Sequence, residues 1–456
     1  MRTVLIRSAL VALAVAAAFA PSVAEGAGRR RVRRGAPVAS NPPSTPAMAD
    51  DVVTMLLSRT PAGGTVVLPR GTYRSAIVVD RPMRIVGSPG GTTIDADGLG
   101  LPALEVLAGV TDVTVENMRF ARADGDGVVA RGGNDRLALM RVVVSNSGGV
   151  GARVVASDGV VVDRSTFESN AGGGLSLEGE GAKATRLYFR LNGATGVAIG
   201  GKDGLVSECW VQGGAVGISL LGVGQNAIRN TLRGVGVALE LDGSSDTCAF
   251  RRNDVRGCAQ VAVARAGSTY GTVSENAADV VSGDAVTLAG TWHTVEGNRF
   301  AHVLGSGVVA DGQSFRIREN AFVGPRGDGV VVRGSGNMVD ANTVSSAGGV
   351  AISTEGDGNV VAVNTCSAAG ADAIQVAGTQ NRVVANTVQV AGGEGLVLSG
   401  DLNIAQDNAL RATAGTGLHV AGGNGNTLST NLVLGCGGAG FLDEGTGTVL
   451  SRNRID

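Results

Sequence analysis

The chain has 456 residues, among them 73 glycines and only 3% aromatic residues, and its formal net charge is −2. So few rings exclude an interior built on aromatic packing, and the balanced charge gives no support for nucleic acid as a partner. The five cysteines form an odd set without CxxC or zinc-type spacing. They are therefore expected to be mostly buried thiols.

Residues 1–24 predict a secretory signal peptide. Arg2 and Arg7 precede an apolar stretch that is too short to span a bilayer, and the small-x-small sequence SVA follows at 22–24. No later run reaches the roughly 18 apolar residues that a spanning helix needs. We therefore expect no membrane span and a location outside the cytoplasm, with the protein secreted, periplasmic or at the cell surface.

The next two segments predict a linker and a cap. Residues 25–46 contain RRRVRR and then PVASNPPSTP, a composition typical of a disordered linker. Residues 47–61 predict a short helix with an acidic first turn and a proline at its end. Its apolar face would consist of Met48, Val52, Met55 and Leu56. We expect this helix to cover the open end of the domain that follows.

An asparagine recurs every 22 residues, with one interval of 23, through the second half of the chain. It stands at Asn276, Asn298, Asn320, Asn342, Asn364, Asn386, Asn408, Asn431 and Asn453. Asn253 and Asn230 precede this series, and Cys209, Leu187, Ser165, Arg141 and Asn117 are expected to continue it backwards. A second series runs five residues ahead, at Asn337, Asn359, Asn381, Asn403 and Asn426.

This period predicts a parallel β-helix over residues 62–456. A repeat of about 22 residues with three short strands is one coil of a solenoid, so the fold class is all-β with three parallel sheets. Two residues after the asparagine, apolar residues such as Phe167, Phe189, Phe300 and Phe322 form an inward ladder. Asparagine suits the corners because it tolerates left-handed backbone and its amide can bond the next amide.

Three stretches resemble a known superfamily: VVLPRGTY at 66–73, IVGSPGGTTID at 85–95 and the GNxVxxNxV coils. They resemble right-handed parallel β-helix proteins of the pectin-lyase-like superfamily over residues 49–456. The resemblance implies the fold, and it leaves open lyases, hydrolases, epimerases, accessory factors and adhesins. The superfamily's Gly-His-Gly, Asn-Thr-Asp and Asp-Pro-His patterns are absent, so the catalytic residues are unknown.

The outward positions beside the inward ladder are unusual in four consecutive coils. In later coils the same positions are bland, as in Ala321 and Val323 or Thr343 and Ser345. Aromatic faces stack on sugar rings and arginines bind carboxylates, so we predict a ligand-binding panel. The alternative is that a loop covers the aromatic residues and the arginines are ordinary solvated charges. The predicted panel consists of Tyr188, Arg190, Trp210, Gln212, Arg233, Asp254 and Arg256.

A second candidate is an acidic cluster of Asp372, Glu394 and His419, which fall in adjacent coils. Carboxylates held this close could share a proton or a calcium ion, and the histidine could assist. The alternative, which we favour, is an exposed polar turn. No motif indicates a cofactor, and His293, His302 and His419 are too far apart in coil phase to form a zinc site.

These features together predict a secreted β-helix protein that binds extracellular polysaccharide. An acidic polysaccharide is one candidate, and lyase or hydrolase activity is left open. The alternative is a non-catalytic structural or adhesion scaffold at the cell surface. The last coil, at 451–456, is expected to present an open strand edge, and the charges of Arg452, Arg454 and Asp456 are expected to disfavour pairing there. Self-association through this edge is a further expectation.

Overall fold

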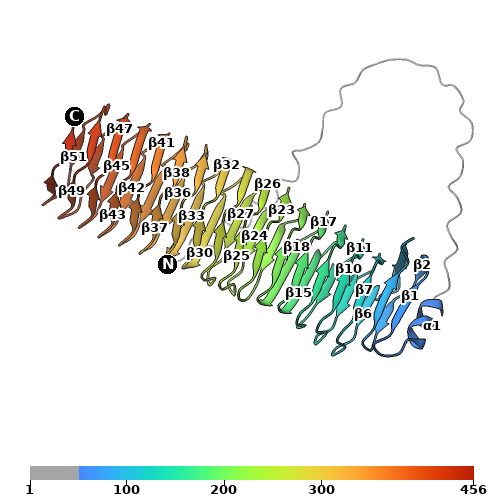
Figure 1. The fold of residues 1–456 in the computed structure, drawn as a ribbon. Helices are drawn as coiled ribbons and strands as arrows, with labels where there is room; N and C mark the ends of the chain where they lie inside the picture. The colour runs from blue at the N-terminus through green and yellow to red at the C-terminus, as the bar shows by residue number, and fades with distance from the viewer. Residues whose placement is uncertain (1–50) are drawn as a thin grey trace, which may run out of the picture. The chain divides into compact units, whose positions relative to one another are not determined.

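The computed structural model describes residues 51–456. The predicted signal peptide, the linker and residues 47–50 of the predicted cap helix lie outside the described residues. Within them, the chain runs through one short helix and then a long stack of coils, each made of three short strands (Figure 1). This arrangement confirms the predicted all-β parallel solenoid with three sheets. No helix of the described part has the length and apolar character needed to cross a membrane.

Helix α1 (Asp51–Arg59) covers the first coil. Val53 and Leu57 are buried in the core, with Val52 and Leu56 packed against it. Met55, which the sequence placed on the apolar face, is 39% exposed, because the buried stripe is centred on Val53 and Leu57, one helical turn apart. The Arg81 guanidinium donates hydrogen bonds to the carbonyls of Leu57 (2.6 Å) and Thr60 (3.0 Å), which ties the end of the helix to the coil beneath it.

Each coil contributes one strand to each of three parallel sheets, which we call B, A and C in the order in which the chain visits them. Sheet B consists of β1 (Thr65–Leu68), β4 (Arg84–Gly87), β7 (Thr114–Glu116), β10 (Ala138–Met140), β13 (Val161–Asp163), β16 (Lys183–Thr185), β19 (Leu205–Ser207), β22 (Asn226–Ile228), β25 (Ala249–Arg251), β28 (Thr272–Ser274), β31 (Thr294–Glu296), β34 (Arg316–Arg318), β37 (Met338–Asp340), β40 (Val360–Ala362), β43 (Arg382–Val384), β46 (Ile404–Gln406), β49 (Thr427–Ser429) and β52 (Val449–Ser451).

Sheet A consists of β2 (Gly71–Arg74), β5 (Thr92–Asp95), β8 (Arg119–Ala121), β11 (Val143–Ser145), β14 (Thr166–Glu168), β17 (Tyr188–Arg190), β20 (Trp210–Gln212), β23 (Thr231–Arg233), β26 (Asp254–Cys258), β29 (Ala277–Val281), β32 (Arg299–Val303), β35 (Ala321–Val323), β38 (Thr343–Ser345), β41 (Thr365–Ala369), β44 (Thr387–Ala391), β47 (Ala409–Thr413), β50 (Leu432–Leu434) and β53 (Arg454–Ile455).

Sheet C consists of β3 (Ile77–Val79), β6 (Leu104–Val106), β9 (Val128–Ala130), β12 (Val150–Val154), β15 (Gly173–Glu180), β18 (Thr195–Lys202), β21 (Val216–Leu220), β24 (Val237–Leu241), β27 (Gln260–Ala264), β30 (Val286–Thr291), β33 (Val308–Gln313), β36 (Val330–Arg333), β39 (Ile352–Glu355), β42 (Ile374–Ala377), β45 (Leu396–Ser399), β48 (Leu418–Val420) and β51 (Phe441–Asp443).

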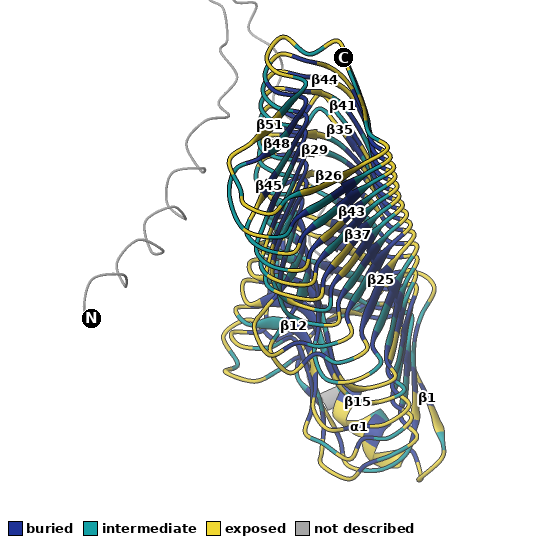
Figure 2. Cartoon of the chain, turned by 90° about the vertical axis from the view of Figure 1, so that its left-hand side faces the viewer, coloured by how far each residue is buried: buried dark blue, intermediate teal, exposed yellow. Residues whose placement is uncertain are grey.

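The core is a column of like side chains stacked along the solenoid. Phe167 stacks on Phe189 with ring centroids 5.3 Å apart, and Phe300 stacks on Phe322 at 5.4 Å. All four rings are buried, as the predicted inward ladder requires. Buried colour fills the inside of the coils and exposed colour follows the turns (Figure 2). Each coil thus covers the apolar face of its neighbour, which no coil could bury alone.

The asparagine series forms a buried ladder of amides between sheets B and A. The Nδ2 of Asn320 donates to the Oδ1 of Asn342 at 3.0 Å, and the step repeats 22 residues later from Asn342 to Asn364 at 3.1 Å. The left-handed residue, however, is the one before each asparagine, such as Glu319 (φ 56°) and Ala341 (φ 55°). The amide therefore explains the repeat, and the expected left-handed asparagine is wrong for this series.

In the first coils the ladder position shifts by one residue. Val142 and Met118 occupy it, because the following strands begin at Val143 and Arg119 and these two residues pair in register. The predicted occupants, Arg141 (φ 52°) and Asn117 (φ 56°), instead take the left-handed corner before it. The 22-residue period fails here because the early coils are longer and less regular.

Candidate functional site

The outer face of sheet A brings the seven predicted panel residues onto four adjacent strands, β17, β20, β23 and β26. Tyr188 pairs in register with Trp210, and the row continues through Thr231 to Asp254. A parallel row runs from Arg190 through Gln212 and Arg233 to Arg256. We call these two rows the sheet A panel.

The aromatic residues of the panel are open to solvent. Tyr188 is 37% exposed and Trp210 is 40% exposed. No loop therefore buries them, which removes one part of the alternative interpretation. Their outward direction follows from the strand alternation, because the next residue on each strand, Phe189 or Val211, points into the core.

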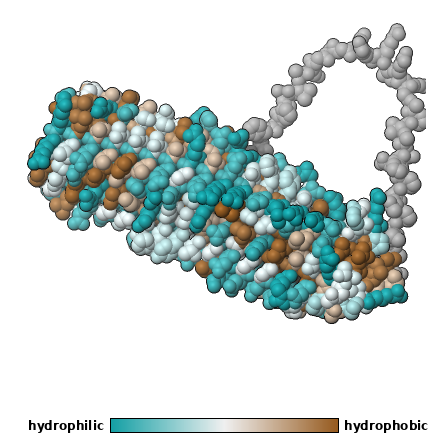
Figure 3. Space-filling model, in the orientation of Figure 1, coloured by the Kyte–Doolittle hydropathy of each residue, from teal (hydrophilic) through white to brown (hydrophobic). Residues whose placement is uncertain are grey.

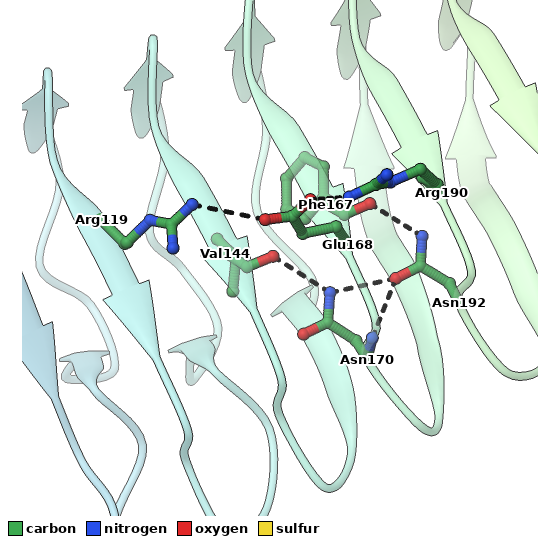
Figure 4. A network of polar contacts seen from close by, with 7 residues as sticks. All are labelled: Arg119, Val144, Phe167, Glu168, Asn170, Arg190 and Asn192. Atoms are coloured by element: carbon green, nitrogen blue, oxygen red, sulfur yellow. Dashed lines mark hydrogen bonds and ion pairs between the residues drawn. The ribbon is translucent and has the colours of Figure 1, made fainter. Parts of the chain in front are cut away.

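The arginines of the panel are mostly paired with acidic residues of neighbouring coils. Arg190 lies 2.9 Å from Glu168, and Arg119 approaches the other oxygen of the same carboxylate at 3.3 Å (Figure 4). The corner beneath is fixed by Asn170, whose Nδ2 donates to the Oδ1 of Asn192 at 3.0 Å. Glu168, which the sequence did not single out, thus neutralises one end of the panel.

Arg233 occupies the centre of the panel. Its guanidinium carbon lies 5.7 Å from the Trp210 ring centroid, within cation–π range. The same guanidinium forms an ion pair with the Asp254 carboxylate and donates to the Asp254 carbonyl at 3.0 Å. Arg233 is therefore held between an aromatic ring and an acid, and it covers part of Trp210.

Beyond the panel the same two rows continue into β29 and β32 and form a shallow hollow of about 270 Å³. We call it the sheet A hollow. Ala277 and Arg299 extend the first row, and Asp279 extends the second. The hollow is lined by Asp254, Arg256, Ala277, Ala278, Asp279, Arg299, Ala301 and His302.

Asp279 and His302 form a hydrogen-bonded pair in this hollow. The His302 Nδ1 lies 2.7 Å from the Asp279 Oδ1, and the Arg256 Nε lies 3.7 Å from the same carboxylate. The hydrogen bond with His302, aided by the charges of His302 and Arg256, lowers the pKa of Asp279. The His302 side chain is 78% exposed, so its imidazole reaches solvent while the carboxylate orients it.

Arg299 differs from the panel arginines. It is exposed at the rim of the hollow, and no ion pair within residues 51–456 involves it. A guanidinium without a local acid is available for a carboxylate or sulfate of a ligand. The sheet A hollow therefore combines one available cation with an oriented imidazole.

A wider hollow of about 630 Å³ lies at the other end of the panel, over β5, β8 and β11 of the same sheet. Thr93, Arg119 and Val143 line it, and these residues continue the outward row that reaches Tyr188. Arg141 adds a second cation at its edge. The outer face of sheet A is thus indented on both sides of the panel.

The sequence missed Asp279 and Arg299 although they keep the phase of the two predicted rows. Extending the rows by two coils beyond Arg256 would have found them. His302 could not be found in this way, because its left-handed backbone (φ 51°) interrupts β32, and strand alternation no longer gives the direction of its side chain.

The second predicted cluster is only partly assembled. His419 Nδ1 lies 3.0 Å from Glu394, and its Nε2 lies 3.3 Å from Glu444, a residue that the sequence did not suggest. Asp372 does not join them. Its carboxylate accepts the Glu394 backbone N–H at 2.6 Å and the Gln375 amide at 2.6 Å, so it serves the turn.

Burial opposes the charged form of His419, but the hydrogen bonds and charges of Glu394 and Glu444 outweigh it and raise its pKa. The imidazole thus bridges two carboxylates of neighbouring coils. Within residues 51–456, no three acidic, histidine or cysteine side chains converge closely enough to hold a metal ion.

The remaining histidine and the cysteines are structural. His293 is buried in the row that later carries the second asparagine series, and its Nδ1 accepts the Gly271 N–H at 2.9 Å. Cys209, Cys248, Cys258 and Cys366 are buried free thiols, and Cys436 is half-buried. Burial raises the pKa of Cys209 and Cys366 to about 12, so these thiols are inert.

Sequence comparison finds the family described as "right handed beta helix region", which matches residues 103–277, 216–366 and 284–455. No curated protein sequence matches the chain significantly. The N-terminal fragment of gene product 12 from bacteriophage phi29 is similar in fold, with 8% identity and a TM-score of 0.56 over 89% of this chain and 92% of that one. A mannuronic acid specific polysaccharide family 6 lyase from human gut microbiota has 14% identity and a TM-score of 0.40 over 79% and 86%.

Proposed function

Because the chain belongs to the right-handed β-helix family, we propose that it uses the outer face of one long parallel sheet to bind an extended polysaccharide. The observation that carries this proposal is the continuity of the sheet A panel with the sheet A hollow. Tyr188, Trp210, Arg256 and Arg299 lie on strands of one sheet, in register and all outward. Six strands from β17 to β32 span five spacings, or roughly 24 Å, at about 4.8 Å each.

The proposed ligand is acidic. Arg299 has no acidic partner among the described residues. Arg256 is loosely paired, because its Nε lies as far as 3.7 Å from the Asp279 carboxylate. Both guanidinium groups can therefore turn toward a carboxylate of the ligand. Arg190 and Arg233 are already neutralised by Glu168 and Asp254. The anionic groups of the polysaccharide would therefore be held at the sheet A hollow, while Tyr188 and Trp210 stack on the sugar rings of the polysaccharide.

Cleavage of the bound chain is a second candidate activity, and the Asp279–His302 pair is the observation that favours it. A carboxylate that accepts from one imidazole nitrogen orients the other nitrogen for proton transfer. In this role His302 would take or give the proton, Asp279 would hold its ring, and Arg299 would position the ligand.

The competing candidate is a non-catalytic scaffold or adhesion protein, favoured by the internal pairing of the panel. Arg190 with Glu168 and Arg233 with Asp254 stabilise neighbouring coils without any ligand. In either case we place the protein outside the cytoplasm, secreted, periplasmic or at the cell surface, on the strength of the signal-peptide sequence at 1–24. Calcium and other cofactors are not required by this proposal.

Self-association through the last coil stays a prediction. Leu450 pairs in register with buried Leu428 but is 51% exposed, because no further described coil covers it. Sedimentation at rising protein concentration tests it: a species that stays monomeric throughout contradicts the prediction.

Calorimetric titration with polygalacturonate, alginate and uncharged dextran tests the proposed function. We expect saturable binding of an acidic polymer that weakens with salt, and a clear loss of affinity in Arg299→Ala. Arg411→Ala is the matched control, because Arg411 is an exposed arginine in a later coil of sheet A, in the neighbouring outward row. New reducing or unsaturated ends in the same samples would report cleavage. Equal affinities for all three polymers, or no binding of any, would favour the scaffold.

A further inference from the structure

Two large aromatic side chains lie exposed at the corner where sheet C turns into sheet B, away from the outer face of sheet A. Tyr270 is 52% exposed and Trp292 is 53% exposed. Their rings stack on each other with centroids 5.9 Å apart and planes 11° from parallel. We call this pair the corner stack. The chain has only two tryptophans and three tyrosines, so this corner holds two of its five large polar aromatic residues.

The fold does not require aromatic residues at this corner. Both take left-handed backbone, with φ of 50° at Tyr270 and 63° at Trp292, a conformation that bulky residues adopt at a cost. Several other coils have glycine at the equivalent corner, as at Gly224, Gly336 and Gly358, each also with positive φ. Strained, exposed and replaceable aromatic residues indicate a role in contact with another molecule.

The backbone holds the corner stack in place. The Tyr270 N–H donates to the Thr291 carbonyl at 3.2 Å, and the Trp292 N–H donates to the Gln313 carbonyl at 3.1 Å. Each ring is thus fixed to the coil that follows it. Neighbouring strands lie about 4.8 Å apart, which is near the separation of stacked rings, so one ring fits per coil.

The outer faces of the stack are open. On the Tyr270 side the next corner residue is Thr247, and on the Trp292 side it is Ser314, followed by Gly336. Because these residues are small, the space beside each ring, one coil further along the corner, is not filled by a large side chain. A flat ring from a ligand can therefore stack on Trp292 above Ser314, with hydroxyl and amide groups of the same corner within reach.

Polar groups lie beside the stack. Thr269 and Thr291 pair beside the rings, and the Thr269 hydroxyl donates to Asp246 at 2.8 Å. An anionic ligand would gain nothing here and would be repelled by Asp246. The apolar area of two rings is also far below the roughly 800 Å² per partner that a stable protein interface buries.

We propose that the corner stack binds an uncharged sugar ring that presents a flat apolar face, such as a glucose unit of a β-linked glucan. The sugar ring lies on the outer face of Trp292 or Tyr270, and its hydroxyls bond to Thr291, Gln313 and Ser314. This site is separate from the acidic-chain surface of sheet A and does not depend on it. The protein would thereby hold two different glycans on two faces.

Tryptophan fluorescence tests this site directly, because Trp210→Phe leaves Trp292 as the only indole. In that variant we expect a saturable change in emission with cellohexaose or laminarihexaose that salt does not weaken. Polygalacturonate should leave the emission unchanged. No saturable change with either neutral hexasaccharide would overturn the proposal.

Trp292→Gly provides the matched test of binding by calorimetry with the same neutral hexasaccharides. We expect the affinity to fall about fivefold or more, since one stacking face is lost. The unfolding temperature should stay the same or rise, because glycine already occupies this corner at Gly336 and Gly358. Equal affinities of the wild-type protein and Trp292→Gly would contradict the proposal.

Discussion

Sheet A contains two regions with the same backbone and different surfaces. From β17 to β32 its outer face carries aromatic, arginine and acidic side chains, whereas from β35 to β47 it carries mainly small residues such as Ala321, Thr343 and Thr365. Both regions have the same inward column, with Phe300 of the first stacked on Phe322 of the second. The inward column is thus common to both regions, and it does not require the aromatic and charged side chains on the outer face of the first region.

The charge distribution sharpens this contrast. In the first region, ion pairs join neighbouring coils, as in Arg190 with Glu168 and Arg233 with Asp254. Along the later rows the outward residues of sheet A, such as Ser345 and Gln389, carry no charge until Arg411. Hydropathy colour over one face of the solenoid shows hydrophilic side chains interspersed with hydrophobic ones, with hydrophobic colour near both ends (Figure 3). The charge on the outer face of sheet A thus changes along the solenoid, whereas the inward residues stay apolar.

The largest expected effect is on the inner face, at the junction of the two regions. Phe322→Ala removes a fully buried ring and should lower the free energy of unfolding by about 3–5 kcal/mol. Val323→Ala, at the next position and 38% exposed, should change it by less than about 0.5 kcal/mol. Guanidinium chloride unfolding followed by circular dichroism measures both. Equal losses would show that the two faces of the strand are not independent.

Trp210→Ala is the next largest test, and it acts on the outer face. The affinity for an acidic polysaccharide should fall by about 1 kcal/mol, or roughly fivefold, because a stacking surface is lost. Thr343→Ala, at the same row position in the later region, should change nothing. Calorimetry on both variants gives the comparison, and unfolding curves check that the solenoid is intact. Matching changes at the two positions would mean that the panel does not bind the ligand.

Much of this contrast could be predicted from the sequence, because the 22-residue period gives the location of each residue on its coil. Once Phe189 and Val211 were assigned to the inside, alternation put Tyr188 and Trp210 on the outside, and the structure places them there. The amide ladder was predictable for the same reason. Side chains at the corners were not, since turn geometry and not alternation directs them.

The corners account for most of what the sequence did not reveal. Tyr270 and Trp292 take positive φ between strands and His302 takes it within β32, and the directions of all three side chains depend on that backbone. Tyr270 and Trp292 are nevertheless 22 residues apart, so two exposed aromatic residues at one coil phase were a signal in the sequence. The acidic partners Glu168 and Glu444 required three-dimensional contacts. The Asp372 carboxylate accepts the Glu394 backbone N–H, a contact of the polar-turn kind that the sequence analysis gave as the alternative.

Arg256→Ala tests the electrostatic part of the contrast. Arg256 faces the sheet A hollow and lies 3.7 Å from Asp279, so its loss removes one cation from the proposed ligand surface. The salt dependence of acidic polysaccharide binding should become shallower, while the stacking contribution of Trp210 persists. Arg411→Ala, in the same row of the later region, should leave the salt dependence as it is. A slope that both variants reduce equally would point to non-specific attraction.

The smallest expected effect is a pH dependence of stability at His419, in the later region. Its pKa is raised in the folded state by Glu394 and Glu444, so the folded protein holds the proton more tightly than the unfolded chain. The stabilisation is therefore complete below the unfolded pKa of about 6.5 and is lost as the pH rises through the folded pKa. His419→Gln should flatten this decline in unfolding temperature measured across that range. A decline that persists unchanged would assign it to other groups.

Hydroxyl-radical footprinting in the presence of a bound acidic polysaccharide tests the central claim, that the decorated region of sheet A is the ligand surface. Tyr188, Trp210 and His302 are all exposed on that face, and Tyr270 and Trp292 are exposed at the separate corner. We predict that the ligand protects the first three side chains from oxidation and leaves the corner pair reactive. Protection of the corner pair instead, or of none of the five, would contradict the account.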